Sequence, residues 1–364
     1  MTDEELIKKT LKLAERGRGK VSPNPLVGAV VTKNNEIIAE GFHREFGGVH
    51  AEVAALDSAR EDVSGGTLYV NLEPCSHTGK QPPCVDRIKK SGIKRVVIGT
   101  FDPNPLVNGK GFSFLRRGLE VRAGVLEAAC QNLNEGFFKH VTTGRPLVTV
   151  KIAQTLDGKI ARADGSSKWI TSEKSRRLVH RMRSQNDAVL VGIGTVLKDS
   201  PRLNVRLVRG QDPKRIVLDS TLKIPLNSNF LTKPLVEKTI IATTSRASKE
   251  KIRSIKELGA DVWTIKKDSK SRVDLSELCK KMGSEGITSV LVEGGSQIFS
   301  AFLQENLADK IAIFIAPKIF GEGLSAVHFN GIHSLHASIK LHEFDKRKVG
   351  DDVLLTGRVN SKKN

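Results

Sequence analysis

Four residues in the first quarter of the chain have the types and spacing of a hydrolytic metal site. His50 and Glu52 stand two positions apart, and two cysteines that each follow a proline come later, at Cys75 and Cys84. One imidazole and two thiolates give zinc three ligands and leave the fourth position to water, as in a catalytic centre. Glu52 would stay off the metal, accept the proton of the activated water and pass it to leaving ammonia. The pattern predicts a zinc-dependent hydrolytic deaminase of a nucleobase-like amine.

The spacing of the two cysteines is unusual for such a site. Zinc deaminases usually carry PCxxC, whereas here the eight residues SHTGKQPP separate Cys75 from Cys84. The inserted loop contains His77 and Lys80, a polar donor and a cation that would suit an anionic or phosphorylated substrate. The alternative interpretation is a solvated surface loop. His-x-Glu alone would more simply be read as ordinary core or surface residues at a helix start, and only the combination with both Pro-Cys pairs favours a metal site.

The elements around these residues alternate between strands and helices. Apolar residues at helical spacing predict an amphipathic first helix, followed by the turn SPNP at 22–25 and two strands over 27–43 with a turn at Asn34-Asn35. We expect helices over 50–60 and 82–92, which would place His50 and Cys84 at helix starts, where the positive end of the helix favours a thiolate. Strands are expected over 66–75 and 94–100. The pattern indicates an α/β sandwich of about 145 residues.

A linker is expected at 142–146, the stretch TTGRP, because a new strand pattern begins directly after it. The prediction is therefore a deaminase domain over 1–145 and a second domain over 146–360. The second half alternates again, with strands predicted at 147–153, 187–197, 214–220, 238–244, 287–295 and 309–321. Helices are predicted at 172–185, 249–259, 274–283 and 296–307.

Composition narrows the classes of partner. The formal charge of +19, from 59 Lys and Arg against 40 Asp and Glu, favours nucleic acid, a membrane surface or small phosphorylated ligands. Aromatic residues make up only 5%, and no basic stretch is interleaved with aromatics, which argues against a nucleic-acid partner. No apolar run is long enough to span a bilayer, and the opening segment lacks the apolar core of a signal peptide. We expect a soluble cytoplasmic protein without a membrane partner, and four cysteines without a disulfide framework.

Longer motifs resemble a known family. SPNPLVGAVV, HAEVAAL, NLEPCSHTGKQPPC and FDPNPLVNGKG in the first half, with KIAQTLDGKIA, GSSKWIT, VGIGTVLKDSPRLNVR, RIVLDS and VEGGSQIFSAFL in the second, resemble the bifunctional riboflavin biosynthesis enzymes. The resemblance implies an α/β fold class, with an N-terminal cytidine-deaminase-like three-layer α/β/α domain and a C-terminal dihydrofolate-reductase-like α/β domain. It implies Zn2+ and NADPH as cofactors, and a homo-oligomer.

The implied reactions are consecutive. Zinc-dependent deamination of 2,5-diamino-6-ribosylamino-4(3H)-pyrimidinone 5′-phosphate would come first, and NADPH-dependent reduction of the ribosyl chain to a ribityl chain would follow. A reductase needs no metal, only a nicotinamide held against the substrate carbon. An anionic substrate and an anionic cofactor would also account for part of the positive charge.

The resemblance assigns roles to residues that the pattern alone would leave ordinary. The implied substrate-binding residues are Asn24, His77, Lys80, Lys151, Ser167, Arg183, Asp199, Leu203, Arg206 and Glu293. The implied NADPH-binding residues are Gln154, Trp169, Thr195, Asp199, Ser220, Gly294, Gly295, Ser296, Gln297, Ile298 and Phe299.

Without the resemblance, several of these residues have simpler interpretations. Gly294 and Gly295 would be either a phosphate-binding turn before a helix or only a turn that needs positive φ. Arg183 and Arg206 would be solvated surface charges, and Trp169 a core aromatic. The chain has Ser200 and Asn204 where the family commonly has Asp and Thr.

Two other functions fit parts of the pattern. One is a deaminase of nucleic-acid bases whose second half binds RNA, but the sequence lacks the aromatics that would stack a flipped base and its neighbours. The other is a degenerate scaffold without activity, against which the intact set of His50, Glu52, Cys75 and Cys84 argues.

Overall fold

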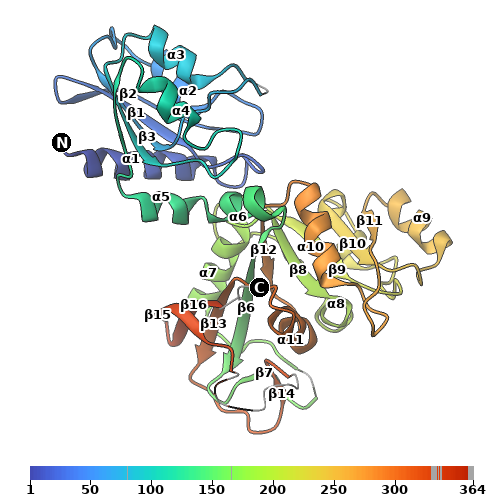
Figure 1. Ribbon diagram of the computed structural model, residues 1–364. Coiled ribbons are helices and arrows are strands. Elements are labelled where there is room, and N and C mark those ends of the chain that lie inside the picture. The colour runs from blue at the N-terminus through green and yellow to red at the C-terminus, as the bar shows by residue number, and fades with distance from the viewer. Residues whose placement is uncertain (80, 165, 329–333, 335, 337, 360–364) are drawn as a thin grey trace. The chain divides into compact units, whose positions relative to one another are not determined.

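The structure, a computed structural model, describes residues 1–79, 81–164, 166–328, 334, 336 and 338–359. The chain divides into two compact units, Met1–Arg145 and Pro146–Asn364 (Figure 1). All four cysteines are free thiols. Among the described residues, no helix combines the length and the apolar character that crossing a membrane requires.

The N-terminal unit is built on a five-stranded sheet with the order β2-β1-β3-β4-β5. β1 runs antiparallel to β2 and β3, and β3, β4 and β5 are parallel. The strands are β1 (Gly28–Lys33), β2 (Glu36–Phe42), β3 (Thr67–Leu72), β4 (Arg95–Thr100) and β5 (Glu120–Ala123). The helices are α1 (Asp3–Ala14), α2 (Ala51–Asp57), α3 (Cys84–Lys90), α4 (Lys110–Leu115), α5 (Glu127–Leu133) and α6 (Glu135–Thr143).

Helices cover both faces of this sheet, because successive strand residues point to opposite sides. Val31 and Val70 pack with α2, α3 and α4, whereas Val30 and Tyr69 from the same strands pack with α1 and α5. The unit therefore has the expected three layers. Gly41 lets α2 approach β2 closely, since a Cβ there would lie 2.3 Å from the backbone nitrogen of Ala55.

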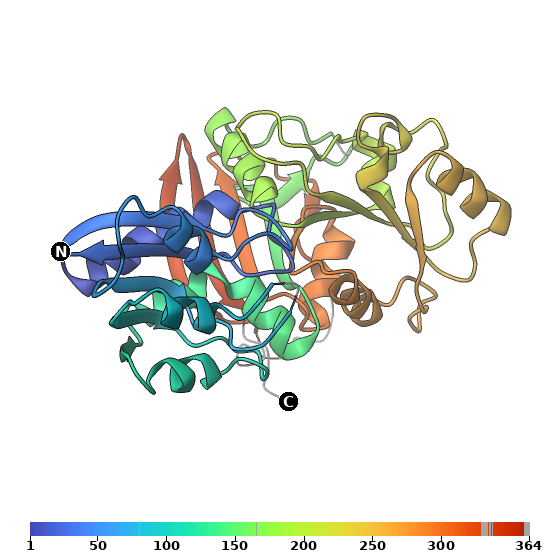
Figure 2. The same cartoon turned by 90° about the horizontal axis from the view of Figure 1, so that it is seen from above.

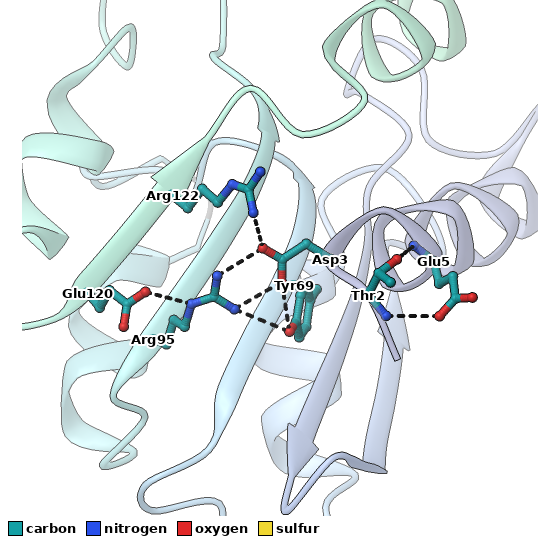
Figure 3. Close-up of polar contacts among 7 residues, drawn as sticks. All are labelled: Thr2, Asp3, Glu5, Tyr69, Arg95, Glu120 and Arg122. Atoms are coloured by element: carbon teal, nitrogen blue, oxygen red, sulfur yellow. Dashed lines mark hydrogen bonds and ion pairs between the residues drawn. The ribbon is translucent and has the colours of Figure 1, made fainter.

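A polar cluster fixes the start of α1 to the sheet (Figure 3). Thr2 and Glu5 form a capping box. Next to them, the carboxylate of Asp3 accepts two hydrogen bonds from Arg95, both 2.9 Å, one of 2.8 Å from Arg122 and one of 3.2 Å from the Tyr69 hydroxyl. These partners come from β4, β5 and β3, so one carboxylate ties α1 to three parallel strands.

The C-terminal unit contains a nine-stranded sheet with the order β11-β10-β9-β8-β12-β6-β13-β16-β15. Figures 1 and 2 show β15 and β16, in red, at one end of this sheet and the gold β11 at the other. Its strands are β6 (Leu147–Thr155), β8 (Ala188–Gly192), β9 (Lys214–Leu218), β10 (Thr239–Thr243), β11 (Asp261–Thr264), β12 (Ser289–Val292), β13 (Lys310–Ala316), β15 (Leu341–Val349) and β16 (Asp352–Val359). A separate two-stranded sheet pairs β7 (Lys159–Ala161) with β14 (Leu324–Ser325).

Seven strands, from β11 to β13, run parallel, and only the hairpin of β16 and β15 is antiparallel. The helices are α7 (Glu173–Ser184), α8 (Ile193–Asp199), α9 (Lys249–Glu257), α10 (Leu275–Ser284) and α11 (Ser296–Gln304). α10 and α11 pack with the strands in one core cluster and α8 and α9 in another. In such a sheet the loops at the carboxyl edge form the binding crevice.

Most predicted elements are present, but one strand was wrong and several elements were not predicted, among them α4, β5, α5, α6, β7 and β11. The strand predicted over 187–197 ends at Gly192, and α8 begins at Ile193, because the apolar run continues through a helix that packs one side on the core. The hairpin of β15 and β16 was not predicted, because β15 is exposed and carries mostly charged side chains. The predicted turn at Asn34-Asn35 is confirmed, with φ of 51° and 66° at the two residues.

The cluster at Asp3 yields a stability prediction. Asp3→Ala should lower the free energy of unfolding of the N-terminal unit by about 1–3 kcal/mol, because it removes a half-buried acceptor of charged hydrogen bonds. The hydrogen bond from Arg95 lowers the pKa of Asp3, so this stability is present above the unfolded pKa of about 3.9 and is lost as the pH falls through the folded value. Hydrogen exchange of β3 and β4 peptides measures it at pH 7 and in acid.

Asp57→Ala is the matched control, since Asp57 pairs with Arg87 on the surface, where ion pairs contribute at most about 1 kcal/mol. Equal protection factors in the Asp3 and Asp57 variants at pH 7 would contradict the role of the cluster.

Candidate active sites

The four residues of the predicted metal site converge at one place in the N-terminal unit. His50 is the N-cap of α2, Cys84 is the first residue of α3, and Cys75 lies just beyond the carboxyl end of β3. The ligand atoms of the three residues all lie within 4.8 Å of one another. His50 Nδ1 is 3.1 Å from Cys84 Sγ and 3.5 Å from Cys75 Sγ, which matches the edge of about 3.6 Å that tetrahedral zinc bond lengths imply. The donor set and its spacing therefore fit zinc.

The electrostatics of this cluster also suit a cation. The hydrogen bond with Cys84 lowers the pKa of the Cys75 thiol, and the same pairing raises the pKa of Cys84. Because zinc binds thiolates, metal binding at this pair would release protons. Glu52, in the first turn of α2, is 4% exposed, and burial raises the pKa of its carboxyl to about 7. A carboxyl with that pKa can both take up and release a proton near neutral pH.

Glu73, which sequence reasoning missed, supports the Cys75 ligand loop. Its buried carboxylate accepts hydrogen bonds from the backbone nitrogens of Asp102 (3.3 Å), Gly109 (3.0 Å) and Phe112 (2.9 Å). A Cβ on Gly111 would lie 2.1 Å from the Pro74 oxygen, so only glycine lets the two segments touch. Glu73 therefore joins the loop after β3 to the loop after β4. Its place in the motif NLEPC was the only signal for this role.

A second residue that sequence reasoning missed, His43, links Asn24 to the metal site, since its ring centroid lies 5.6 Å from that of His50. His43 Nδ1 is 3.0 Å from the Val49 oxygen and must donate to it, so Nε2 accepts from the Asn24 amide nitrogen at 3.0 Å. Burial lowers the pKa of His43, consistent with this neutral form. The amide oxygen of Asn24 is left to act as an acceptor. The backbone of Leu26 is fixed by the side chains of Asn71 and Asn134.

The loop between the cysteines is described only in part. His77 lies within it, and its buried Nδ1 has no hydrogen-bond partner among the described residues. Since buried polar atoms are normally hydrogen-bonded, this nitrogen is available to a ligand. Lys80, the predicted cation of this loop, lies outside the described residues.

The C-terminal unit contains a cavity of about 1200 Å³ at the carboxyl edge of its parallel strands. It is lined from β6, α7, α8, β9 and the start of α11, and by the loops that follow β9, β10 and β11. Fifteen of the predicted residues line it: Lys151, Ser167, Trp169, Arg183, Thr195, Asp199, Arg206, Ser220, Glu293, Gly294, Gly295, Ser296, Gln297, Ile298 and Phe299. Leu203 and Gln154 are not among the lining residues; Leu203 is buried in the core cluster of α8 and α9.

A buried ion network lies in this cavity. The carboxylate of Glu293 accepts two hydrogen bonds from Arg183, and Lys151 Nζ is 3.7 Å from the same carboxylate. Burial alone would raise the pKa of Glu293, but the charges of Arg183 and Lys151 lower it to about 2. Burial also lowers the pKa of Lys151. The solvated-surface interpretation of Arg183 was wrong, since its side chain is only 11% exposed.

Asn204, a departure from the family pattern, orients two arginines of the cavity. Its backbone oxygen accepts from Arg183 Nη1 at 3.1 Å, and its amide oxygen accepts from Arg206 Nη1 at 2.8 Å. His180 accepts a hydrogen bond from the backbone nitrogen of Arg206, and burial lowers the pKa of His180 to about 4. At Ser200, the other departure, the hydroxyl accepts a hydrogen bond from the Asn229 side chain at 2.9 Å.

The glycine pair closes β12 and opens α11 into the cavity. Gly295 has φ +77°, and a Cβ on Gly294 would lie 2.8 Å from Val191, so both positions require glycine. The first backbone amides of α11 line the cavity, an arrangement that suits a phosphate. Trp169 is 61% exposed at its mouth, with the Arg176 guanidinium 4.7 Å from its ring, so the core-aromatic interpretation was wrong.

Comparisons with known proteins cover both units. Residues 146–355 match the family of RibD C-terminal domains, and residues 1–100 match the cytidine and deoxycytidylate deaminase zinc-binding region. The chain is similar to riboflavin biosynthesis protein RibD of Aquifex aeolicus, with 45% identity over 97% of each chain. RibD of Actinobacillus pleuropneumoniae is 43% identical, over 98% of this chain and 95% of its own.

Two solved structures are similar to this chain over nearly its whole length. A diaminohydroxyphosphoribosylaminopyrimidine deaminase/5-amino-6-(5-phosphoribosylamino)uracil reductase of Thermotoga maritima is 41% identical, with a TM-score of 0.85 over 98% of this chain and 99% of its own. RibD of Acinetobacter baumannii is 35% identical, with a TM-score of 0.88 over 99% of each chain.

The contacts of Glu73 predict that its replacement speeds zinc loss, although Glu73 is not one of the proposed zinc ligands. Glu73→Ala should speed zinc loss from the protein about tenfold or more, because three buried backbone donors lose their acceptor and the Cys75 loop loosens. Glu73→Gln keeps one acceptor oxygen and should have a smaller effect. The rate of zinc transfer to a chromogenic chelator measures this directly. A rate unchanged in Glu73→Ala would show that the loop holds its ligand without Glu73.

Proposed function

The chain belongs to the RibD family of bifunctional riboflavin biosynthesis proteins, and we propose which of its residues carry out the family's deaminase and reductase steps. The deaminase step belongs to the zinc site of His50, Cys75 and Cys84, and the reductase step, which uses NADPH in this family, to the C-terminal unit. The observation that supports the assignment most is the convergence of three ligand atoms within 4.8 Å beside the buried Glu52.

In the deaminase, His50, Cys75 and Cys84 would hold zinc, which supplies the Lewis acidity that makes water a nucleophile near neutral pH. Glu52 takes a proton at its carboxylate and returns it to the amine as ammonia leaves. The amide oxygen of Asn24 would accept a hydrogen bond from the pyrimidine. His77 and Lys80 are proposed to bind the polar or phosphorylated part of the substrate, which the unpartnered Nδ1 of His77 supports.

In the reductase, the substrate would be the phosphoribosyl pyrimidine that deamination produces. Lys151 presents a buried ammonium group that Glu293 and Arg183 hold in place, and it can donate to a sugar oxygen. Arg206, fixed by Asn204 and His180, is proposed to bind the phosphate. The remaining proposed substrate residues are Ser167, Arg183, Asp199 and Leu203; because Leu203 is buried, it would shape the loop that carries Arg206.

NADPH, when bound, supplies the hydride for this reduction. Residues 294–299, at the start of α11, are proposed to hold its pyrophosphate, and Trp169, Thr195, Asp199 and Ser220 would line its path. The donors would be the amides at the helix start other than those of Ile298 and Phe299, which already donate to the Gly295 oxygen. Gln154, near the carboxyl end of β6, is proposed to contact the cofactor as well. The two proposed domains are 1–145 for the deaminase and 146–360 for the reductase. A homo-oligomer and a cytoplasmic location stay predictions; the four free thiols support the latter.

The proposal is tested by Glu52→Gln. This variant should lose deamination by a factor of about 100 or more, because the amide cannot exchange a proton, and it should keep one zinc per chain. Ammonia release and metal analysis measure the two effects. Reduction of the already deaminated pyrimidine by NADPH should continue at the wild-type rate and is the internal control. Loss of zinc in Glu52→Gln would make Glu52 a ligand, and loss of the reductase activity would contradict separate sites.

A further inference from the structure

Four cations gather at one end of the reductase cavity, away from the residues proposed for the substrate. Lys223 follows β9, Arg246 follows β10, and Lys270 and Arg272 lie in the loop between β11 and α10. All four line the cavity, and we call them the cationic cluster. None of them belongs to the residues that the family resemblance assigned to substrate or NADPH.

Hydrogen bonds join the segments of the cationic cluster to Ser220. The Ser220 hydroxyl accepts from the Val273 backbone nitrogen at 3.1 Å, and the Ser220 backbone oxygen accepts from the Thr244 hydroxyl at 2.7 Å. Arg246 Nη1 donates to the Ser271 oxygen at 3.4 Å. The ends of β9 and β10 and the loop after β11 therefore form one connected wall around Ser220.

The cations of the cationic cluster outnumber the carboxylates at the same end of the cavity. Three carboxylates share its end of the cavity, Asp219, Asp268 and Glu305. Asp268 is already paired with Arg272, at 2.9 Å, and also accepts two backbone hydrogen bonds of its own loop. Within the described residues, Lys223, Arg246 and Lys270 form no ion pair. This end of the cavity therefore suits an anion.

The position of the cationic cluster fits one part of a dinucleotide. The amides of α11 follow β12, and Ser220 follows β9, two strands away in the sheet. Two strand spacings are about 10 Å, the length scale of an adenosine between its 2′ oxygen and its pyrophosphate. Lys151, on β6, lies on the other side of β12. The cavity thus has two cationic ends with a phosphate-binding helix start between them.

We propose that the cationic cluster binds the 2′-phosphate of NADPH and makes the reductase select NADPH over NADH. The inference rests on the proposed reductase function and adds the residues that discriminate between the cofactors. Guanidinium groups bind phosphate through paired, charge-assisted hydrogen bonds, and a neutral 2′-hydroxyl offers them no charge to neutralise. Arg246 carries most of the selection, because among the cations of the cluster without a carboxylate partner in the described residues it alone has a guanidinium group.

Arg246→Gln tests the proposal through cofactor kinetics. With the deaminated pyrimidine as substrate, kcat/KM for NADPH should fall about ten- to a hundredfold, mainly through KM, while kcat/KM for NADH stays within about twofold. Arg246→Lys keeps the charge and should restore part of the loss. Arg253→Gln is the matched control, because it removes the same charge from exposed α9 outside the cavity lining and should change neither cofactor.

Calorimetry with two fragments gives a second readout that does not need catalysis. Adenosine 2′,5′-bisphosphate should bind the wild-type protein more tightly than adenosine 5′-monophosphate, and Arg246→Gln should remove that difference. Equal affinities of the two fragments for the wild-type protein would overturn the proposal.

The kinetic outcomes separate this inference from the proposed function. If the wild-type protein oxidises NADPH but Arg246→Gln loses NADPH and NADH activity equally, the arginine is structural and the proposal is wrong. If only the KM for the pyrimidine rises, the cationic cluster binds substrate phosphate instead, which also overturns it. A wild-type protein that oxidises neither cofactor would refute the reductase assignment itself.

Discussion

Both sites depend on how a parallel sheet must end. Each strand has to leave the sheet at its carboxyl edge and turn into a loop or helix, so side chains from these turns meet although they are far apart in sequence. In the N-terminal unit the turns after β3 and β4 bring Glu73 against the loop of Asp102 and Cys75 against the start of α3. In the C-terminal unit the turns after β8, β9, β10 and β12 surround a single cavity. Two different reactions can therefore use the same architectural solution.

Buried carboxylates then hold the loops and side chains of the two sites in position. Glu73 has no ion pair with the residues that the structure describes but accepts three backbone hydrogen bonds, which makes it a support for the metal loop. Glu293 has two cationic partners, and a buried carboxylate that lost one of them would be strongly destabilised. Asp3 is a third such carboxylate, and it fixes α1 to the sheet through Arg95. It lies at the opposite end of the strands, where Arg95 begins β4 and Thr67 begins β3.

The sequence was most informative where chemistry requires residue types at close spacing. His50, Glu52, Cys75 and Cys84 could be found this way, because a metal site needs specific ligands near helix starts and strand ends. Glu73 and His43 could not, because their partners lie in loops whose approach only the tertiary fold decides. α8 was mistaken for a strand since an apolar run has the same composition in both elements. The cationic cluster was hidden for another reason: single basic residues spread over many positions look like ordinary surface charge.

In the proposed function, one chain performs a deamination and then a reduction at separate sites. The most direct test is to give the purified protein the phosphorylated diaminopyrimidine, with and without NADPH, and to follow ammonia and the nicotinamide absorbance together. We predict the same initial rate of ammonia release in both mixtures, and NADPH oxidation that begins only after ammonia has accumulated. Ammonia release that requires NADPH, or ammonia release that is never followed by NADPH oxidation, would contradict this account.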